Sequence, residues 1–222
     1  MDGLGRLTKG KSFSAQSERI KSMKIFKSIS AAAILVICLS GCYKTETDEA
    51  IVIIGDSLGM QFQSILSTRI QMRDNAPLVI TNSMGGMAAA YESAHLYWAG
   101  RVREVQKITN ISTLIVSLGS NDGTLYGLAG TEVDLIDQFP GAINSIVESA
   151  QGATVFWVIP SDESSMYYND GIREMLQTAS DVYPNLTLVE IGGGGLAEDN
   201  IHLSPEGQES VNDQLMVLMG YE

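Results

Sequence analysis

Five short runs of apolar, mostly β-branched residues recur after position 49, separated by longer stretches that mix apolar and polar residues. The first run is wholly apolar rather than alternating, and the others are similar, which is typical of strands buried on both faces, as in parallel sheets. The strands we expect are residues 50–54, 78–80, 113–116, 154–159 and 186–191.

Helical patterns fill the stretches between these runs. They cover the residues after Ser57, then 89–107, 132–149, 171–179 and a last helix from 205. We expect an interruption of the third helix at Pro140-Gly141, because proline removes a hydrogen bond inside a helix.

The last helix has the clearest sequence pattern. Ser204 is a suitable N-cap, and Pro205 suits the first helical position, where its missing N–H costs nothing. Val211, Leu215 and Leu218 then fall on one face, which we expect to be buried.

Alternating strands and helices predict an α/β fold of three layers, with a five-stranded parallel sheet between helices. The flavodoxin-like order 2-1-3-4-5 is the expected arrangement, and its ligands bind at the carboxyl ends of the first and third strands. Residues 55–57 and 117–122 should therefore face each other across a site.

The N-terminal part of the sequence has the pattern of a targeting segment and not that of a folded domain. From Met23, two lysines precede a ten-residue apolar run and then small residues, the layout of a secretory signal peptide. The run is shorter than the roughly 20 residues that span a bilayer. We treat residues 1–22 as an over-extended start, 23–41 as the signal peptide, 42–49 as a tether and 50–222 as the domain.

Charge separates the same two parts. The chain has a formal net charge of −12, and residues 1–42 hold seven basic and two acidic side chains, so the remainder, with seven basic and 24 acidic, is at −17. An acidic domain repels phosphate backbones, which makes nucleic acid an unexpected partner.

Both cysteines, Cys38 and Cys42, precede the domain, and with only two histidines a zinc site is not expected.

A serine follows the first expected strand, in Gly55-Asp56-Ser57-Leu58-Gly59. At the N-terminus of a helix, free N–H groups and the helix dipole stabilise negative charge. The run also matches the G-x-S-x-G pattern of a nucleophile elbow. Taken alone, it is equally an ordinary helix cap.

Three further polar runs follow later strands. Asp199 stands three residues before His202, where its carboxylate can hold the imidazole toward a nucleophile. Asn121 follows the third strand and can donate to an oxyanion. Gly85 and Gly86 follow the second strand, where glycine lets a backbone N–H approach a ligand closely. Each of these is an ordinary turn when taken alone.

Together, these four runs resemble the blocks of the SGNH/GDSL hydrolase family, over residues 51 to about 207. The resemblance implies a serine esterase without metal or cofactor, with catalytic Ser57, His202 and Asp199. It implies an oxyanion hole of the Ser57 N–H, the Gly86 N–H, or less favourably that of Gly85, and the Asn121 side chain. The substrate would be a small-molecule or carbohydrate ester, such as an acetylated sugar, a lysophospholipid or a short acyl ester.

The residues before Cys42, Leu39-Ser40-Gly41, resemble a bacterial lipobox. That resemblance implies acylation of Cys42, export and a lipid anchor in the cell envelope. Tyr43 rather than Asp follows the cysteine, which resembles an outer-membrane sorting signal.

Two alternatives stay open at this point. An O-acyltransferase would use the same serine with a sugar hydroxyl in place of water. A non-catalytic envelope binding lipoprotein would keep the fold alone. The loops at 119–130 and 161–169 are candidates for the walls of the substrate pocket.

Overall fold

A computed structural model of the chain describes residues 49–90, 94–122, 135–161, 170–191 and 195–221. The chain divides into two units, residues 1–44 and 45–222, and the described elements all belong to the second. The signal peptide, Cys42 and the tether up to residue 48 lie outside the described residues, as do most of the two loops expected to line a pocket.

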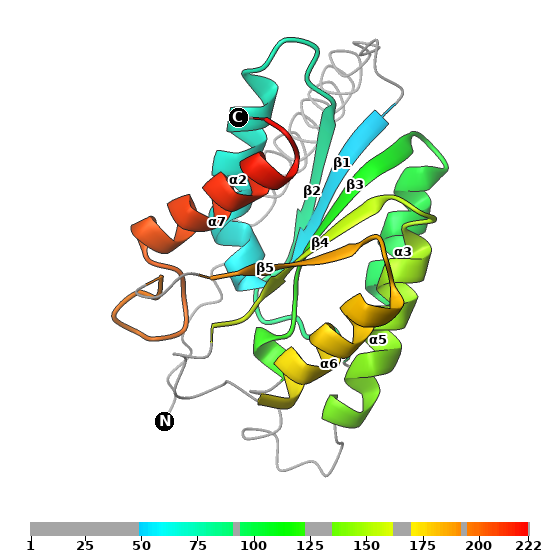
Figure 1. Ribbon diagram of the computed structural model, residues 1–222, viewed down its shortest axis with the longest axis vertical. Helices are drawn as coiled ribbons and strands as arrows, with labels where there is room; N and C mark the ends of the chain where they lie inside the picture. Colours follow the sequence, from blue (N-terminus) through cyan, green and yellow to red (C-terminus); the bar gives the residue numbers. More distant parts are fainter. Residues whose placement is uncertain (1–48, 91–93, 123–134, 162–169, 192–194, 222) are drawn as a thin grey trace, which may run out of the picture. The chain divides into compact units, whose positions relative to one another are not determined.

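Five parallel strands form one sheet in the order β2-β1-β3-β4-β5, which confirms the predicted topology (Figure 1). The strands are β1 (Glu49–Gly55), β2 (Leu78–Ser83), β3 (Asn110–Ser117), β4 (Thr154–Ile159) and β5 (Leu186–Glu190). Strands β1, β4 and β5 match the predicted runs to within one residue at each end. Strand β2 extends three residues beyond its run, and β3 begins three residues earlier and ends one residue later than predicted.

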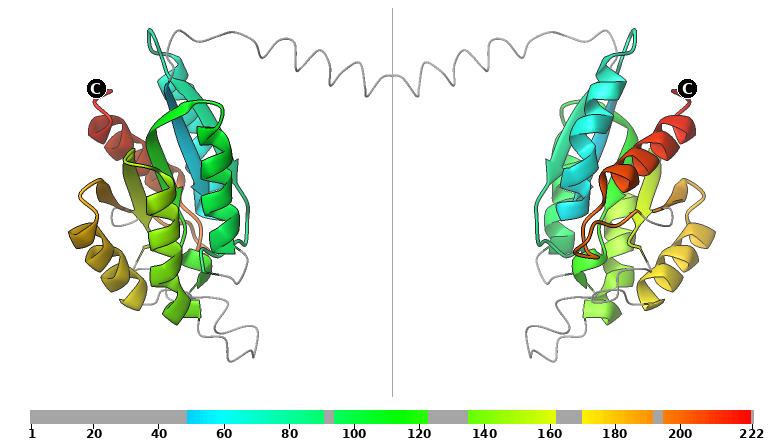
Figure 2. Two further views of the ribbon diagram at one scale, coloured as in Figure 1. Left: turned by 90° about the vertical axis from the view of Figure 1, so that its right-hand side faces the viewer. Right: turned by 90° about the vertical axis from the view of Figure 1, so that its left-hand side faces the viewer.

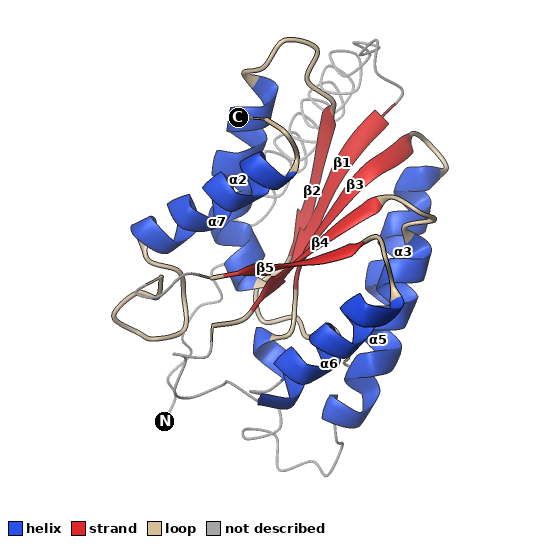
Figure 3. Ribbon diagram, in the orientation of Figure 1, coloured by secondary structure: helices blue, strands red, loops and turns tan. Residues whose placement is uncertain are grey.

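Helices cover both faces of the sheet, which gives the predicted three layers (Figure 3). One face carries α2 (Ser57–Gln71) and α7 (Pro205–Leu218), and the two helices contact each other. The other face carries α3 (Ala94–Gln106), α5 (Leu135–Ser149) and α6 (Asp170–Val182), in that order across the sheet (Figure 2).

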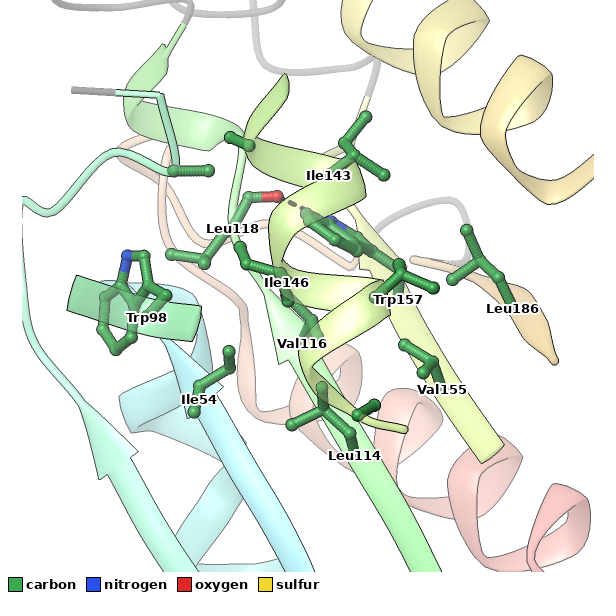
Figure 4. Close-up of a cluster of buried hydrophobic side chains, with 14 of the residues drawn as sticks. Ile54, Trp98, Leu114, Val116, Leu118, Ile143, Ile146, Val155, Trp157 and Leu186 are labelled. Carbon is green, nitrogen blue, oxygen red and sulfur yellow. Dashed lines mark hydrogen bonds between the residues drawn. The ribbon is translucent and has the colours of Figure 1, made fainter. Parts of the chain in front are cut away.

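Strand β1 supplies both apolar layers, because successive side chains of a strand point to opposite faces. Ile51 and Ile53 pack with α2 and α7, whereas Val52 and Ile54 pack with the three-helix layer. In that second layer, the indole Nε1 of Trp157 donates to the Leu118 carbonyl at 2.9 Å, which satisfies the one polar atom of a fully buried ring (Figure 4).

The predicted interruption at Pro140-Gly141 is wrong, since α5 runs continuously through both residues. Pro140 is exposed, so its ring points to water, while Phe139 and Ile143 of the same helix are buried. The packing of that apolar face outweighs one missing backbone hydrogen bond.

The last helix begins as predicted, with Ser204 as its N-cap and Pro205 in its first turn. Val211 and Leu215 are buried as expected, but Leu218 is 45% exposed, so its predicted burial is wrong. The buried stripe instead continues through Asn212 and Met216, in steps of four residues, and Leu218 lies outside it in the last turn.

Candidate active site

The three central strands end side by side. Gly55 of β1 pairs with Ser83 of β2 on one side and with Ser117 of β3 on the other. A Cβ atom at Gly55 would lie 2.9 Å from the Ser117 carbonyl oxygen, so only glycine permits this approach. The sequence runs that follow these strands are therefore brought to one edge of the sheet, as the topology predicted.

Ser57 is the first residue of α2. The preceding Asp56 is its N-cap, and the Asp56 carboxylate accepts a hydrogen bond from the Leu58 N–H at 2.9 Å. Ser57 therefore stands in a first turn whose N–H groups have no acceptors within the helix. Ser57 is half-buried, whereas Asp56 is fully buried.

Asn121 joins two of the turns at this edge. Its amide nitrogen donates to the Asp56 carboxylate at 3.2 Å and to the Met87 carbonyl at 3.1 Å. The hydroxyl of Ser120 also donates to Asp56. Asn121 thus joins the serine turn to the segment that follows β2, and its role as an oxyanion donor stays a prediction.

Two buried carboxylates underlie the site. Asp122 accepts hydrogen bonds from the Ala89 and Ala90 N–H groups, at 2.8 and 2.6 Å, and is fully buried like Asp56. Burial raises the pKa of each carboxyl to about 6, because an apolar surrounding disfavours the charged form. Asp122 is bonded by backbone N–H groups, whereas Asp56 is bonded by the Leu58 N–H and by the side chains of Ser120 and Asn121.

The two candidate oxyanion glycines differ in conformation. Gly86 has φ +74°, a region that favours glycine, and a Cβ atom there would meet nothing within 4 Å. A Cβ atom at Gly85 would lie 3.8 Å from the Met60 sulfur, an ordinary contact. The turn therefore requires glycine at 86 for its backbone, while the choice of the oxyanion N–H stays a prediction.

Asp199 and His202 are in direct contact. The imidazole Nδ1 lies 2.7 Å from Asp199 Oδ2, and Asp199 Oδ1 accepts the backbone N–H groups of Ile201 and His202 at 3.0 and 2.9 Å. These bonds, with the backbone N–H of His202 first, lower the pKa of Asp199 to about 2. The carboxylate is thus ionised at neutral pH and oriented to hold the ring, as in a Ser-His-Asp arrangement.

The histidine loop is tied to the helix that starts at Ser57. The Leu203 N–H donates to Gln61 Oε1 at 2.9 Å, across 142 positions of sequence. Within the described ranges, no hydrogen bond joins the Ser57 hydroxyl to His202, so their convergence stays a prediction. Sequence reasoning missed Gln61, and its only signal was a position four residues after Ser57, on the same helix face.

No cluster of three metal-binding side chains occurs among the residues that the structure describes. Of the helices within these residues, none is long and apolar enough to cross a bilayer. The side chain of His95, the second histidine, lies outside the described residues.

No protein-family model matches the sequence, and neither does any curated protein. Solved structures match in fold. A mutant of Axe2, an acetyl-xylooligosaccharide esterase from Geobacillus Stearmophilus, superposes with a TM-score of 0.62 at 14% identity, over 81% of this chain and 97% of that one. TesA gives 0.56 at 20% identity, over 77% and 97% of the two chains. A GDSL-like lipase from Bacteroides thetaiotaomicron VPI-5482 gives 0.56 at 14%, over 78% and 88%.

Proposed function

We propose that this chain, which has the fold of GDSL-like lipases and esterases, is a carboxylic ester hydrolase that forms an acyl-enzyme on Ser57. The observation that carries the proposal is the 2.7 Å contact between His202 Nδ1 and Asp199, in a loop bonded to the helix that begins at Ser57. A histidine held in this way suits the base of an acyl transfer, and a serine at a helix N-terminus suits its nucleophile.

The chemistry proceeds in two halves. His202 Nε2 takes the Ser57 hydroxyl proton as Oγ bonds to the ester carbonyl carbon, and the resulting oxyanion is stabilised by the Ser57 and Gly86 N–H groups and the Asn121 amide. The imidazolium, stabilised by Asp199, then gives its proton to the leaving alkoxide as the C–O bond breaks. Water attacks the acyl-enzyme with His202 again as base, releasing the acid and Ser57.

A short acyl ester, with an acetylated carbohydrate as the leading class, is the substrate we propose. The Axe2 neighbour acts on acetyl-xylooligosaccharides. The acidity of the chain, with a formal charge of −12, favours a neutral substrate over a phosphorylated one.

We further propose that the protein is exported and held in the cell envelope by a lipid on Cys42, on the strength of its lipobox-like sequence.

Covalent labelling tests the nucleophile. A fluorophosphonate probe should label the wild type and Ser64→Ala, an exposed serine two turns along the same helix, but not Ser57→Ala. p-Nitrophenyl esters of increasing chain length and acetylated xylooligosaccharides then define the acyl preference. Labelling that persists in Ser57→Ala would contradict the assignment. Product analysis with and without an acceptor sugar separates hydrolysis from transfer.

A further inference from the structure

Gln61 contacts both backbone groups of one residue in the histidine loop. Its Oε1 accepts the Leu203 N–H at 2.9 Å, and its Nε2 reaches the Leu203 carbonyl oxygen at 3.5 Å. That carbonyl oxygen also accepts from Gln208 Nε2 at 3.3 Å. Only a primary amide presents a donor and an acceptor side by side, as a neighbouring peptide group would.

Leu203 is a fixed point of the loop. Its side chain is buried and packs in the apolar layer that also contains Leu58 and Phe62 of α2. Leu203 forms an isolated antiparallel bridge with Leu196, and the next residue, Ser204, donates its N–H to the Gly195 carbonyl at 2.8 Å. A bond to the backbone of Leu203 therefore fixes the loop as a whole.

His202 is the immediate chain neighbour of this fixed point. Its own carbonyl accepts the Ala197 N–H at 2.7 Å, and its N–H donates to Asp199. These contacts define the shape of the loop but lie entirely within it. The bonds of Gln61 are different, because they join the loop to α2, the helix whose first residue is Ser57.

We propose that Gln61 is a positioning residue that sets the His202 imidazole against the Ser57 hydroxyl. The side chains at positions 57 and 61 are one turn apart on the same helix face. Gln61 therefore fixes the position of the histidine loop relative to the helix that carries the nucleophile. The inference rests on the proposed acyl-enzyme chemistry, and it assigns Gln61 no contact with the substrate.

Two variants separate the parts of this contact. Gln61→Met keeps the length of the side chain and removes both hydrogen bonds. Gln61→Glu keeps an acceptor for the Leu203 N–H but sets an oxygen against the Leu203 carbonyl. Because a misplacement of about 1 Å can cost roughly 10²-fold in rate, we expect kcat to fall about 10- to 100-fold in Gln61→Met, with KM within about twofold. Gln61→Glu should recover part of that loss.

Gln177→Met is the matched control. Gln177 lies on α6 and bonds only to side chains of its own helix among the described contacts, Ser180 and Asp181. The same chemical change there should leave kcat unaltered. Thermal unfolding of all three variants, followed in parallel, identifies any loss of folded protein.

Amide hydrogen exchange at Leu203, measured by NMR on the whole domain, reports the contact without reference to activity. Exchange at Leu203 should accelerate at least tenfold in Gln61→Met and stay near wild type in Gln177→Met. Faster exchange with an unchanged kcat, or unchanged exchange, would overturn the positioning role while leaving Ser57 chemistry intact. A wild type without Ser57-dependent turnover would instead defeat the proposed function, and the positioning role with it.

Discussion

Asn121 has an amide nitrogen with two hydrogens, and the structure bonds both of them, to Asp56 and to the Met87 carbonyl. An oxyanion can take the first of these, because Asp56 keeps the Leu58 N–H and the Ser120 hydroxyl as partners. Asn121 is thus held in place before substrate arrives, which is the preorganisation that makes such donors effective.

Asn121→Ala should therefore lower kcat by about 10²–10³ with little change in KM, since the donor acts mainly on the transition state. Steady-state kinetics on p-nitrophenyl acetate measure this, and a thermal unfolding midpoint close to that of wild type serves as the control. A fall in kcat of less than tenfold would contradict the assignment of Asn121 to the oxyanion hole.

The buried carboxylates make stability depend on pH. Asp56 and Asp122 have folded pKa values of about 6, above the ordinary value of 3.8, so the folded protein binds more protons than the unfolded chain between these values. Stability should fall as pH rises from about 4 to 7 and then level off, by about 3 kcal/mol for the two groups between pH 5 and 7.5. Asp199, with a pKa of about 2, does not titrate in this window.

Urea unfolding at pH 5 and pH 7.5 tests this expectation. Asp122→Asn should reduce the difference by roughly half, because one of two titrating groups is removed. Asp137→Asn, an exposed carboxylate on α5, is the control and should leave the difference unchanged. A wild type that is more stable at the higher pH would contradict the assignment.

At the scale of elements, patterns local in sequence predicted most of the fold. The strands followed from their β-branched runs and the start of α7 from Ser204 and Pro205. The errors came where tertiary packing decides: α5 continues past Pro140 because its buried face holds it, and Leu218 falls outside the buried stripe. The contact of Gln61 with Leu203 spans 142 positions, and no local sequence pattern predicts it.

Two helical glycines show how differently elements tolerate a methyl group. A Cβ atom at Gly141 of α5 meets nothing within 4 Å, whereas at Gly207 of α7 it would lie 1.9 Å from the Gly195 carbonyl oxygen, which is backbone. Gly195 bonds to Ser204 and begins the segment that leads to His202.

Gly141→Ala should stabilise the protein by about 0.5–1 kcal/mol, because glycine in a helix interior costs that much relative to alanine. Gly207→Ala should destabilise it by about 1–3 kcal/mol and also lower kcat, since α7 and the histidine segment must move apart. Urea unfolding and ester hydrolysis measure both. Equal stability of the two variants would contradict the close packing of α7 on Gly195.

At the scale of the whole molecule, the polypeptide enters and the proposed chemistry occurs at opposite ends of one strand. The chain joins β1 at Glu49, and Ser57 follows the other end of β1 at Gly55, so about 20 Å of strand separates them. Six residues lie between Cys42 and Glu49, and the seven steps from one to the other reach at most about 25 Å. The proposed lipid on Cys42 would therefore be joined to the domain through the start of β1, and not through the end of β1 that leads to Ser57.

Cys42→Ala should therefore move the protein from the membrane fraction to the soluble fraction, because an acyl chain is what would bind it to the bilayer. Its kcat/KM on a soluble p-nitrophenyl ester should stay within about twofold of wild type, since the anchored end takes no part in acyl transfer. Fractionation of expressing cells, with Cys38→Ala as the matched cysteine control, measures the first effect. Retention of Cys42→Ala in the membrane fraction would refute the anchor, and a large loss of soluble activity would show that the entering segment contributes to the site.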